Sequence, residues 1–279
     1  MEHHAAPDLD ADAALAALEW LVELGVTEAV GDAPVNSYDL PDTLARMRAA
    51  EPAPEPAAQA RPAPELAVVR PQREEGPDPV AVARAAAERA RSLDDLREAI
   101  TAYDLCELKK GAKSTVFADG NPKARVMIIG EAPGRDEDVQ GKPFVGRAGH
   151  LLDKMFAAIG LSRETPDAEG AFYITNVLPW RPPGNRDPEP LEIAQMLPFL
   201  RRHVELADPD LIVLMGNAAC AAALGQRGIL RLRGKWAEAF GRPALPMTHP
   251  AYLLRQPHAK REAWADLLAL RARLNALAP

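Results

Sequence analysis

The fold is decided by Val126-Met-Ile-Ile-Gly-Glu-Ala-Pro-Gly-Arg-Asp-Glu-Asp-Val-Gln-Gly-Lys-Pro-Phe-Val-Gly146. Its first four residues are apolar, a run of the length of a buried strand. The run stops at Gly130, and a loop of Gly, Pro and carboxylates leads to a helix predicted over about residues 148–160. A strand, a Gly-rich loop and a helix in this order present backbone N–H groups at the carboxyl edge of an α/β sheet. The loop contains neither a Walker motif nor the dinucleotide fingerprint, so a different kind of ligand is indicated.

The same alternation of strand and helix continues to the end of the chain. Four strands are predicted, and four helices follow them at about 148–160, 189–206, 217–224 and 258–275. The strands are 126–129, 172–176, 211–215 and 244–248. Alternation of this kind indicates a parallel sheet covered by helices on both faces. We therefore expect an α/β three-layer sandwich with a central four-stranded parallel sheet, plus a helical N-terminal extension.

The N-terminal third has a different composition. We predict an acidic helical extension over residues 1–50, with a helix at about 8–30 that either docks on the main domain or binds a partner. We predict that residues 51–78 are a Pro/Ala-rich linker, disordered or extended, because eight prolines within 51–79 leave too little apolar surface to form a core. The main domain is expected to span 79–279. It should begin with a helical segment at about 79–103 that is broken or capped at Ser92.

Charge divides the chain in the same way. Residues 1–100 carry 9 Lys/Arg against 20 Asp/Glu, whereas residues 101–279 carry 24 against 20. Although the overall net charge is −7, the C-terminal part is mildly basic. The acidity lies in a separate segment, so it does not exclude a polyanionic partner for the C-terminal part. Two cysteines make no disulfide framework and suggest a reducing compartment. With no apolar run near 18 residues and no signal pattern, we expect a cytoplasmic protein without a membrane partner.

Four loops should meet at the carboxyl edge of the sheet, namely 130–146, 176–188, 216–217 and 249–255. In the first, Glu131 follows the strand directly, and three further carboxylates lie at 136–138. They either cap or solvate the loop or contribute to a metal site, and capping or solvation is favoured because the other loops offer few hard ligands. Phe144 is either an anchor for this loop or a platform on which a planar ligand stacks.

The other loops carry polar and basic residues. Asn176 either caps the turn after its strand or reads the N3–H/O4 edge of a pyrimidine through its amide. Arg181 and Arg186 lie on a proline-stiffened loop that suits phosphate contacts or simply solvent. His249-Pro-Ala-Tyr-Leu-Leu-Arg255 combines a histidine with apolar and basic residues, which suits insertion into a base stack.

Five of these motifs together resemble the uracil-DNA glycosylase superfamily, and family 4 in particular. They are Gly130-Glu-Ala-Pro-Gly134, Gly141-Lys-Pro-Phe-Val-Gly146, Tyr173-Ile-Thr-Asn176, Arg181-Pro-Pro-Gly-Asn-Arg186 and His249-Pro-Ala-Tyr-Leu-Leu-Arg255. The resemblance covers about residues 103–275 and nothing in residues 1–100. It implies monofunctional hydrolysis of the N-glycosidic bond of uracil in DNA, with uracil as product, a monomeric protein, and no strand scission.

The resemblance also implies roles for individual residues. Glu131 and the backbone of Ala132 would position the attacking water or polar groups of the uracil. Phe144 would stack on the flipped base, and Asn176 would read its Watson–Crick edge. His249 would donate to uracil O2 as negative charge builds on the leaving base. The DNA-binding set would comprise Arg181, Arg186, Tyr252, Leu253, Leu254 and Arg255, with Leu253 and its neighbours filling the gap in the duplex.

The chain departs from the family 4 pattern at the positions of an iron–sulfur cluster. That family holds a [4Fe–4S] cluster on four cysteines, and here the matching positions are Tyr103, Cys106, Trp180 and Met196. We therefore expect no cofactor and no metal, and apolar packing at these positions. Two other functions stay open: a glycosylase of wider range acting on hypoxanthine or xanthine, and a catalytically silent module that binds DNA lesions.

Overall fold

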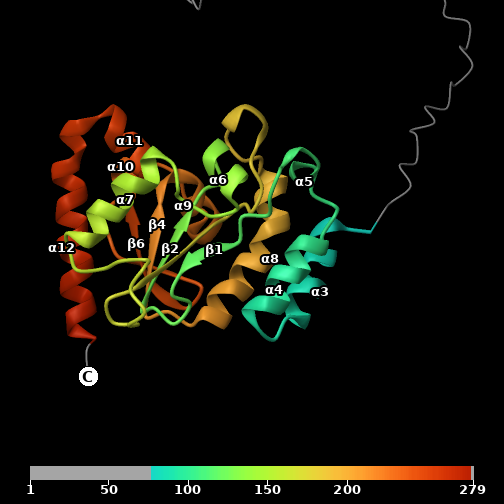
Figure 1. Cartoon of the computed structure of the whole chain (residues 1–279), viewed down its shortest axis with the longest axis horizontal. Helices are drawn as coiled ribbons and strands as arrows, with labels where there is room; N and C mark the ends of the chain where they lie inside the picture. The colour runs from blue at the N-terminus through green and yellow to red at the C-terminus, as the bar shows by residue number, and fades with distance from the viewer. Residues whose placement is uncertain (1–76, 278–279) are drawn as a thin grey trace, which may run out of the picture. The chain divides into compact units, whose positions relative to one another are not determined.

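The computed structural model describes residues 77–277 and contains a six-stranded sheet (Figure 1). The spatial order of the strands is β1-β3-β2-β4-β6-β5. The four central strands are parallel, and the two edge strands are antiparallel to their neighbours. The strands are β1 (Ala118–Gly120), β2 (Val126–Gly130), β3 (Phe172–Asn176), β4 (Leu211–Met215), β5 (Ala237–Ala239) and β6 (Arg242–Met247).

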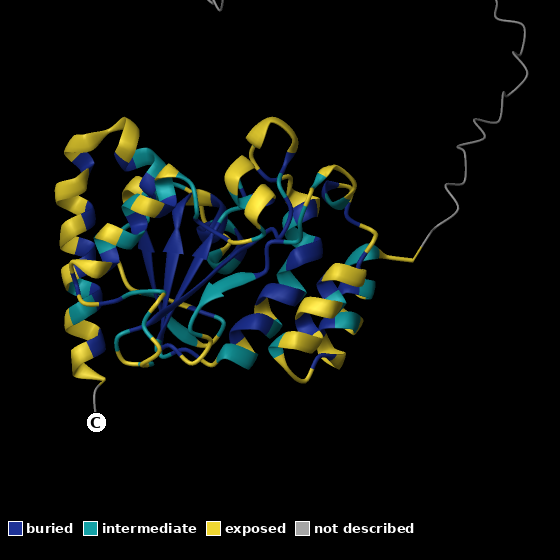
Figure 2. Ribbon diagram, in the orientation of Figure 1, coloured by how far each residue is buried: buried dark blue, intermediate teal, exposed yellow. Residues whose placement is uncertain are grey.

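The predicted α/β fold with its four parallel strands is confirmed, and β1 and β5 are additions to it. Each edge strand has three residues and is only partly buried, so neither leaves an apolar run in the sequence. The central strands β2, β3 and β4 are buried at every position (Figure 2). This burial explains the apolar runs 126–129, 172–174 and 211–215 in the sequence.

Alternate strand residues enter two separate cores. One face of the sheet packs on α7 (Arg147–Ala157) and α12 (Lys260–Ala276), through side chains such as Ile128, Phe156 and Leu270. The other face packs on α8 (Pro190–Ala207) and α9 (Gly216–Leu224), and α3 (Pro79–Arg89) and α4 (Leu93–Ala102) extend this second core. The sheet is thus the middle layer of three, as predicted.

The helical segment that opens the domain is broken at Ser92. Its hydroxyl accepts from the N–H of Asp95, and the Asp95 carboxylate accepts from the N–H of Ser92, which is a capping box. The break lets α3 and α4 fold against each other and α8. The shorter helices are α5 (Leu108–Gly111), α6 (Arg135–Gln140), α10 (Ile229–Leu232) and α11 (Pro250–Arg255), with 3₁₀ turns at η1 (Pro183–Asn185) and η2 (Pro257–Ala259).

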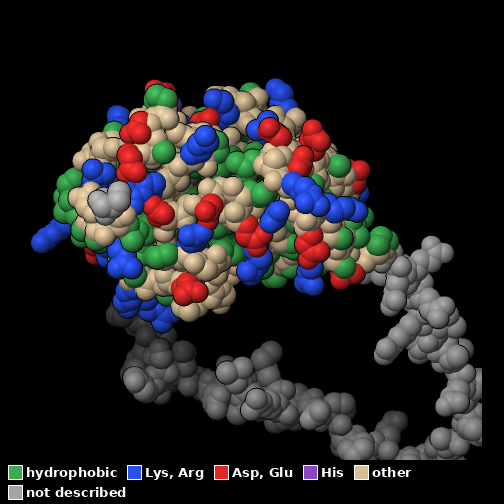
Figure 3. All heavy atoms as spheres, turned by 90° about the horizontal axis from the view of Figure 1, so that it is seen from below, with side chains coloured by type: hydrophobic (Ala, Val, Ile, Leu, Met, Phe, Trp, Pro, Cys, Tyr) green, Lys and Arg blue, Asp and Glu red, His purple; other side chains and the backbone are tan. Residues whose placement is uncertain are grey.

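The predicted N-terminal helix and linker lie outside the described residues. Between residues 77 and 277, none of the helices has the length and apolar character needed to cross a bilayer. Figure 3 views the domain from below, away from the carboxyl edge, and basic and acidic side chains are interspersed over that face. The predicted loops with their candidate site residues lie at the opposite edge, where the parallel strands end.

Candidate active site

A cavity of about 540 Å³ lies at the carboxyl edge of the central strands. All four predicted loops contribute to its wall, through residues such as Glu131, Arg186, Gly216 and His249. The convergence follows from the parallel register, in which β2, β3, β4 and β6 end side by side.

Phe144 and Asn176 meet over Gly130. The register pairs Gly130 with Asn176, and a Cβ on Gly130 would lie 2.3 Å from Asn176 Oδ1 and 2.5 Å from the Phe144 ring. Only glycine therefore fits beneath these two side chains. Asn176 is buried, and its Oδ1 has no hydrogen-bond partner within residues 77–277. Because an unpaired buried acceptor is costly, a ligand group is a natural partner for it.

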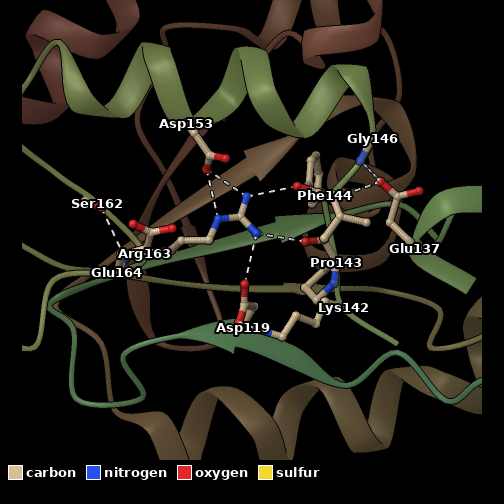
Figure 4. Close-up of polar contacts among 11 residues, drawn as sticks. Asp119, Glu137, Lys142, Pro143, Phe144, Gly146, Asp153, Ser162, Arg163 and Glu164 are labelled. Atoms are coloured by element: carbon tan, nitrogen blue, oxygen red, sulfur yellow. Dashed lines mark hydrogen bonds and ion pairs between the residues drawn. The ribbon is translucent and has the colours of Figure 1, made fainter. Parts of the chain in front are cut away.

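Two carboxylates of the first loop, Glu137 and Asp138, cap backbone groups, in line with the favoured interpretation. Glu137 Oε1 accepts from the N–H groups of Val145 and Gly146 at 3.0 and 2.9 Å (Figure 4). Its Oε2 accepts from the N–H group of Gly134. Asp138 accepts from the N–H groups of Lys113 and Ser114. In the described part of the chain, no cluster of three or more His, Cys, Asp or Glu side chains is arranged to hold a metal ion.

His249 is held as a neutral imidazole with its proton on Nε2. Its Nδ1 accepts from the N–H of Ala251 at 3.1 Å, so Nδ1 cannot carry the proton. Burial, helped by the nearby charge of Arg255 and opposed by that of Glu137, lowers the pKa of His249 to about 4. At neutral pH the Nε2–H group is therefore a hydrogen-bond donor without a positive charge.

Glu131 is partly buried in the cavity wall. Burial raises the pKa of this carboxyl, the charge of Asp187 raises it further, and Arg227 acts in the opposite direction. A carboxylate with a raised pKa is a stronger base, which suits the positioning or deprotonation of a water. Sequence reasoning missed the effects of Asp187 and Arg227 on Glu131. Asp187 lies in the 176–188 loop that was expected at this edge, whereas Arg227 lies outside all four predicted loops.

The segment after His249 is a helix rather than the loop that was predicted. Pro250 occupies its first position, and His249 caps it through the bond to Ala251. The helix buries Leu253, which is 1% exposed and packs on Ala259 and Ala263. Leu253 is therefore unavailable for insertion into DNA in this structure. Leu254, at 39% exposed, and Arg255 face solvent, and Tyr252 lines the cavity.

The two predicted phosphate-binding arginines differ in how many of their N–H donors are already bonded within the protein. Arg186 lines the cavity, but its guanidinium makes two bonds to the Glu192 carboxylate, at 3.0 and 2.6 Å. Arg181 is partly exposed and donates Nε to Asn185 Oδ1. Arg181 thus retains more donors for a phosphate than Arg186 does.

The four positions that match the cluster ligands do not fit an iron–sulfur cluster. Tyr103, Cys106, Trp180 and Met196 are each at most 4% exposed and belong to one apolar core. Only one of them offers a thiol, and burial raises the pKa of the Cys106 thiol, which opposes formation of a thiolate. Trp180 donates its Nε1–H to Thr115 Oγ1 at 3.1 Å, and Tyr103 packs edge-on against Phe199. The prediction of apolar packing at these positions is confirmed.

Comparison with known proteins agrees with the geometry. The family model of the uracil DNA glycosylase superfamily matches residues 117–268. The Type-4 uracil-DNA glycosylase of Archaeoglobus fulgidus is 41% identical over 184 residues, which cover 63% of this chain and 89% of that protein. The proteins of the same name from Saccharolobus solfataricus and Thermotoga maritima are 36% and 35% identical, over 66% and 60% of this chain and 87% and 85% of their own lengths.

Proposed function

The chain belongs to the uracil-DNA glycosylase superfamily, and from that premise we propose that it hydrolyses the N-glycosidic bond of uracil in DNA and leaves an abasic site. The observation that carries this proposal is the neutral His249. Its imidazole lies beside the Phe144 ring, with the two ring centroids 5.4 Å apart, in a cavity that also holds Glu131. This arrangement suits a planar base that leaves as an anion.

In the proposed mechanism the base stacks on Phe144 and His249 donates to its O2. The glycosidic bond breaks dissociatively, so negative charge gathers on the uracil and positive charge on the sugar. A preorganised donor directed at the developing anion contributes about 10²–10³ in rate. Glu131 positions the attacking water and accepts its proton. None of the described residues lining the cavity is a lysine, which supports hydrolysis without a Schiff base and without strand scission.

Specificity for uracil is assigned to Asn176. Its buried Oδ1 can accept from the N3–H of uracil, and its amide N–H₂ can donate to O4. Cytosine presents an unprotonated N3 and an amino group at the same positions, so it would leave the Asn176 oxygen unpaired. A buried hydrogen bond of this kind discriminates strongly, because the wrong base pays the full cost of an unmatched polar group.

Access to a base in duplex DNA requires flipping, which costs a few kcal/mol. We assign the wedge that fills the resulting gap to exposed Leu254 and to Tyr252, in place of Leu253. Arg255 and Arg181 would contact backbone phosphates, with a smaller contribution from Arg186. The protein would act as a monomer in the cytoplasm. Its two cysteines are buried free thiols, in keeping with a reducing compartment.

The test uses end-labelled oligonucleotides that carry uracil, hypoxanthine, xanthine or thymine opposite guanine. Alkali treatment after incubation converts each abasic site into a strand break. We expect breaks at uracil only, and none before alkali. Asn176→Ala should lower single-turnover excision by about 10²–10³, through loss of base reading. Release of hypoxanthine or xanthine would support the wider-range enzyme, and binding without release would support a lesion-binding module.

A further inference from the structure

Phe144 has an unusual backbone. Its φ is +54°, in the left-handed region that residues other than glycine rarely adopt. A bulky residue is strained there, so the surrounding structure must hold it in place. The neighbouring helix comes so close that a Cβ on Gly149 would lie 1.8 Å from the Phe144 carbonyl oxygen. Phe144 is thus fixed in a conformation that would not persist without support.

Arg163 supplies that support from below the loop. Its guanidinium donates to the carbonyl oxygens of Pro143 at 2.9 Å and Phe144 at 3.1 Å (Figure 4). The Arg163 side chain is only 10% exposed, so these bonds are largely shielded from water. The Glu137 carboxylate accepts from the N–H groups of the next two residues after Phe144. The side chains of Arg163 and Glu137 therefore fix the backbone on both sides of Phe144.

Two carboxylates fix the guanidinium itself. Asp153 of α7 accepts from Nε at 2.9 Å, and Asp119 of β1 accepts from Nη1 at 3.2 Å. Arg163 lies between α7 and β3, well outside the motifs of the cavity, and it is absent from the cavity wall. Some of its N–H donors bind the carboxylates of Asp153 and Asp119, which fix the guanidinium. The others bind the backbone carbonyls of Pro143 and Phe144, which the guanidinium fixes in turn. A planar guanidinium is suited to this, and a lysine ammonium is a poor substitute.

We propose that Arg163 is a positioning residue for base excision, which sets the Phe144 ring at the angle required to stack on the flipped base. The proposal rests on the proposed function and adds a residue that touches neither the base nor His249. A displaced platform would misalign the base relative to His249 and Asn176. Misplacement of a reacting group by about 1 Å can cost about 10² in rate.

The experiment compares Arg163→Gln with a matched control, Arg125→Gln. Arg125 is 13% exposed and likewise binds two carboxylates, Asp210 and Glu169, and one carbonyl oxygen, that of Leu277. It precedes β2 at the opposite edge of the sheet. We expect both variants to lose similar thermal stability. Only Arg163→Gln should lower single-turnover excision, by about 10- to 100-fold, with Arg163→Lys only partly restoring the rate.

A double-mutant cycle with Phe144→Leu distinguishes positioning from general destabilisation. If Arg163 acts through Phe144, the double variant should excise uracil no more slowly than Phe144→Leu alone. The proposal would be overturned if the rate losses of the two single variants multiplied in the double variant. It would also be overturned if Arg163→Gln excised uracil as fast as Arg125→Gln. If Arg163→Gln fails to fold, Asp119→Asn and Arg163→Lys replace it. Their excision rates are then compared with that of Arg125→Gln and tested in the same cycle with Phe144→Leu.

Hydrogen exchange provides a readout that does not depend on activity. The amides of Val145 and Gly146 should lose protection in Arg163→Gln and keep it in Arg125→Gln. Unchanged protection in both variants would contradict the proposal. A wild-type protein that releases no uracil would refute the proposed function, whereas the exchange experiment would still decide whether Arg163 holds the loop.

Discussion

The ring of Phe144 lies 5.4 Å from the imidazole of His249, centroid to centroid, with an angle of 30° between the two planes. The two residues come from loops after β2 and β6, and the sheet brings them together. Gly216 leaves room for the His249 side chain, because a Cβ on Gly216 would stand 3.3 Å from His249 Cβ. A base that stacks on Phe144 would thus have its edge within the range of the His249 donor.

The first prediction concerns this donor. His249→Ala should lower single-turnover excision of uracil by about 10²–10³, because it removes the group that stabilises the departing anion. The control is His258→Ala, at an exposed position of η2, which should excise at the wild-type rate. Equal rates for the two variants would exclude His249 from the mechanism.

The second prediction concerns the pH dependence of excision. If ionised Glu131 is the base, the rate should fall as pH drops through its raised pKa. Asp187→Asn removes a neighbouring negative charge, so it should shift this acid limb to lower pH. Arg227→Gln removes a positive charge and should shift the limb to higher pH. Single-turnover rates measured across pH would show the two shifts, and shifts in the same direction would argue against Glu131.

A third prediction concerns stability at acid pH. Burial lowers the pKa of His203 to about 3 and of His249 to about 4, from 6.5. The unfolded chain therefore binds more protons below pH 6.5, and stability should fall as pH drops from about 6.5 towards 4. Each histidine contributes a slope of about 1.4 kcal/mol per pH unit. His203→Gln should have a shallower slope than wild type in denaturant titrations, and an identical slope would contradict this account.

The fourth prediction concerns the core that replaces a cluster. Trp180 is 1% exposed, so Trp180→Ala should destabilise the fold by about 3–5 kcal/mol. The control is Trp264→Ala, because Trp264 is 44% exposed and its truncation should change stability by no more than about 0.5 kcal/mol. Weaker DNA binding by Trp180→Ala at unchanged stability would mean that this residue acts on the DNA. Stoichiometric iron in anaerobically purified protein would contradict the apolar assignment.

The fifth prediction concerns the acidic N-terminal segment. Its excess of carboxylates should repel the phosphate backbone, so deletion of residues 1–76 should leave excision intact and DNA affinity equal or higher. The deletion keeps Asp78, whose carboxylate caps α3 by accepting from the N–H of Val80. A folded but inactive truncation would show that the segment belongs to the catalytic unit.

The sequence by itself determined the central sheet and the position of the cavity. Residues 126–129, 172–174 and 211–215 are apolar runs because these strands are buried on both faces, and this pattern can be seen without knowledge of distant contacts. The parallel order of the strands then places their carboxyl ends at one edge. The motif residues Glu131, Phe144 and His249 can therefore be assigned to one site from the sequence alone.

Only the tertiary structure decided what each side chain can do there. Leu253 looks exposed in sequence, yet helix α11 buries it, because the cap on Ala251 turns the chain into a helix whose apolar face meets α12. The protonation of His249 depends on a bond within that cap, and the pKa of Glu131 depends on Asp187 and Arg227. Arg163 gives no local signal at all. Its role arises from the packing of β1, α7 and the Phe144 loop around one guanidinium, a relationship between segments that no short stretch of sequence contains.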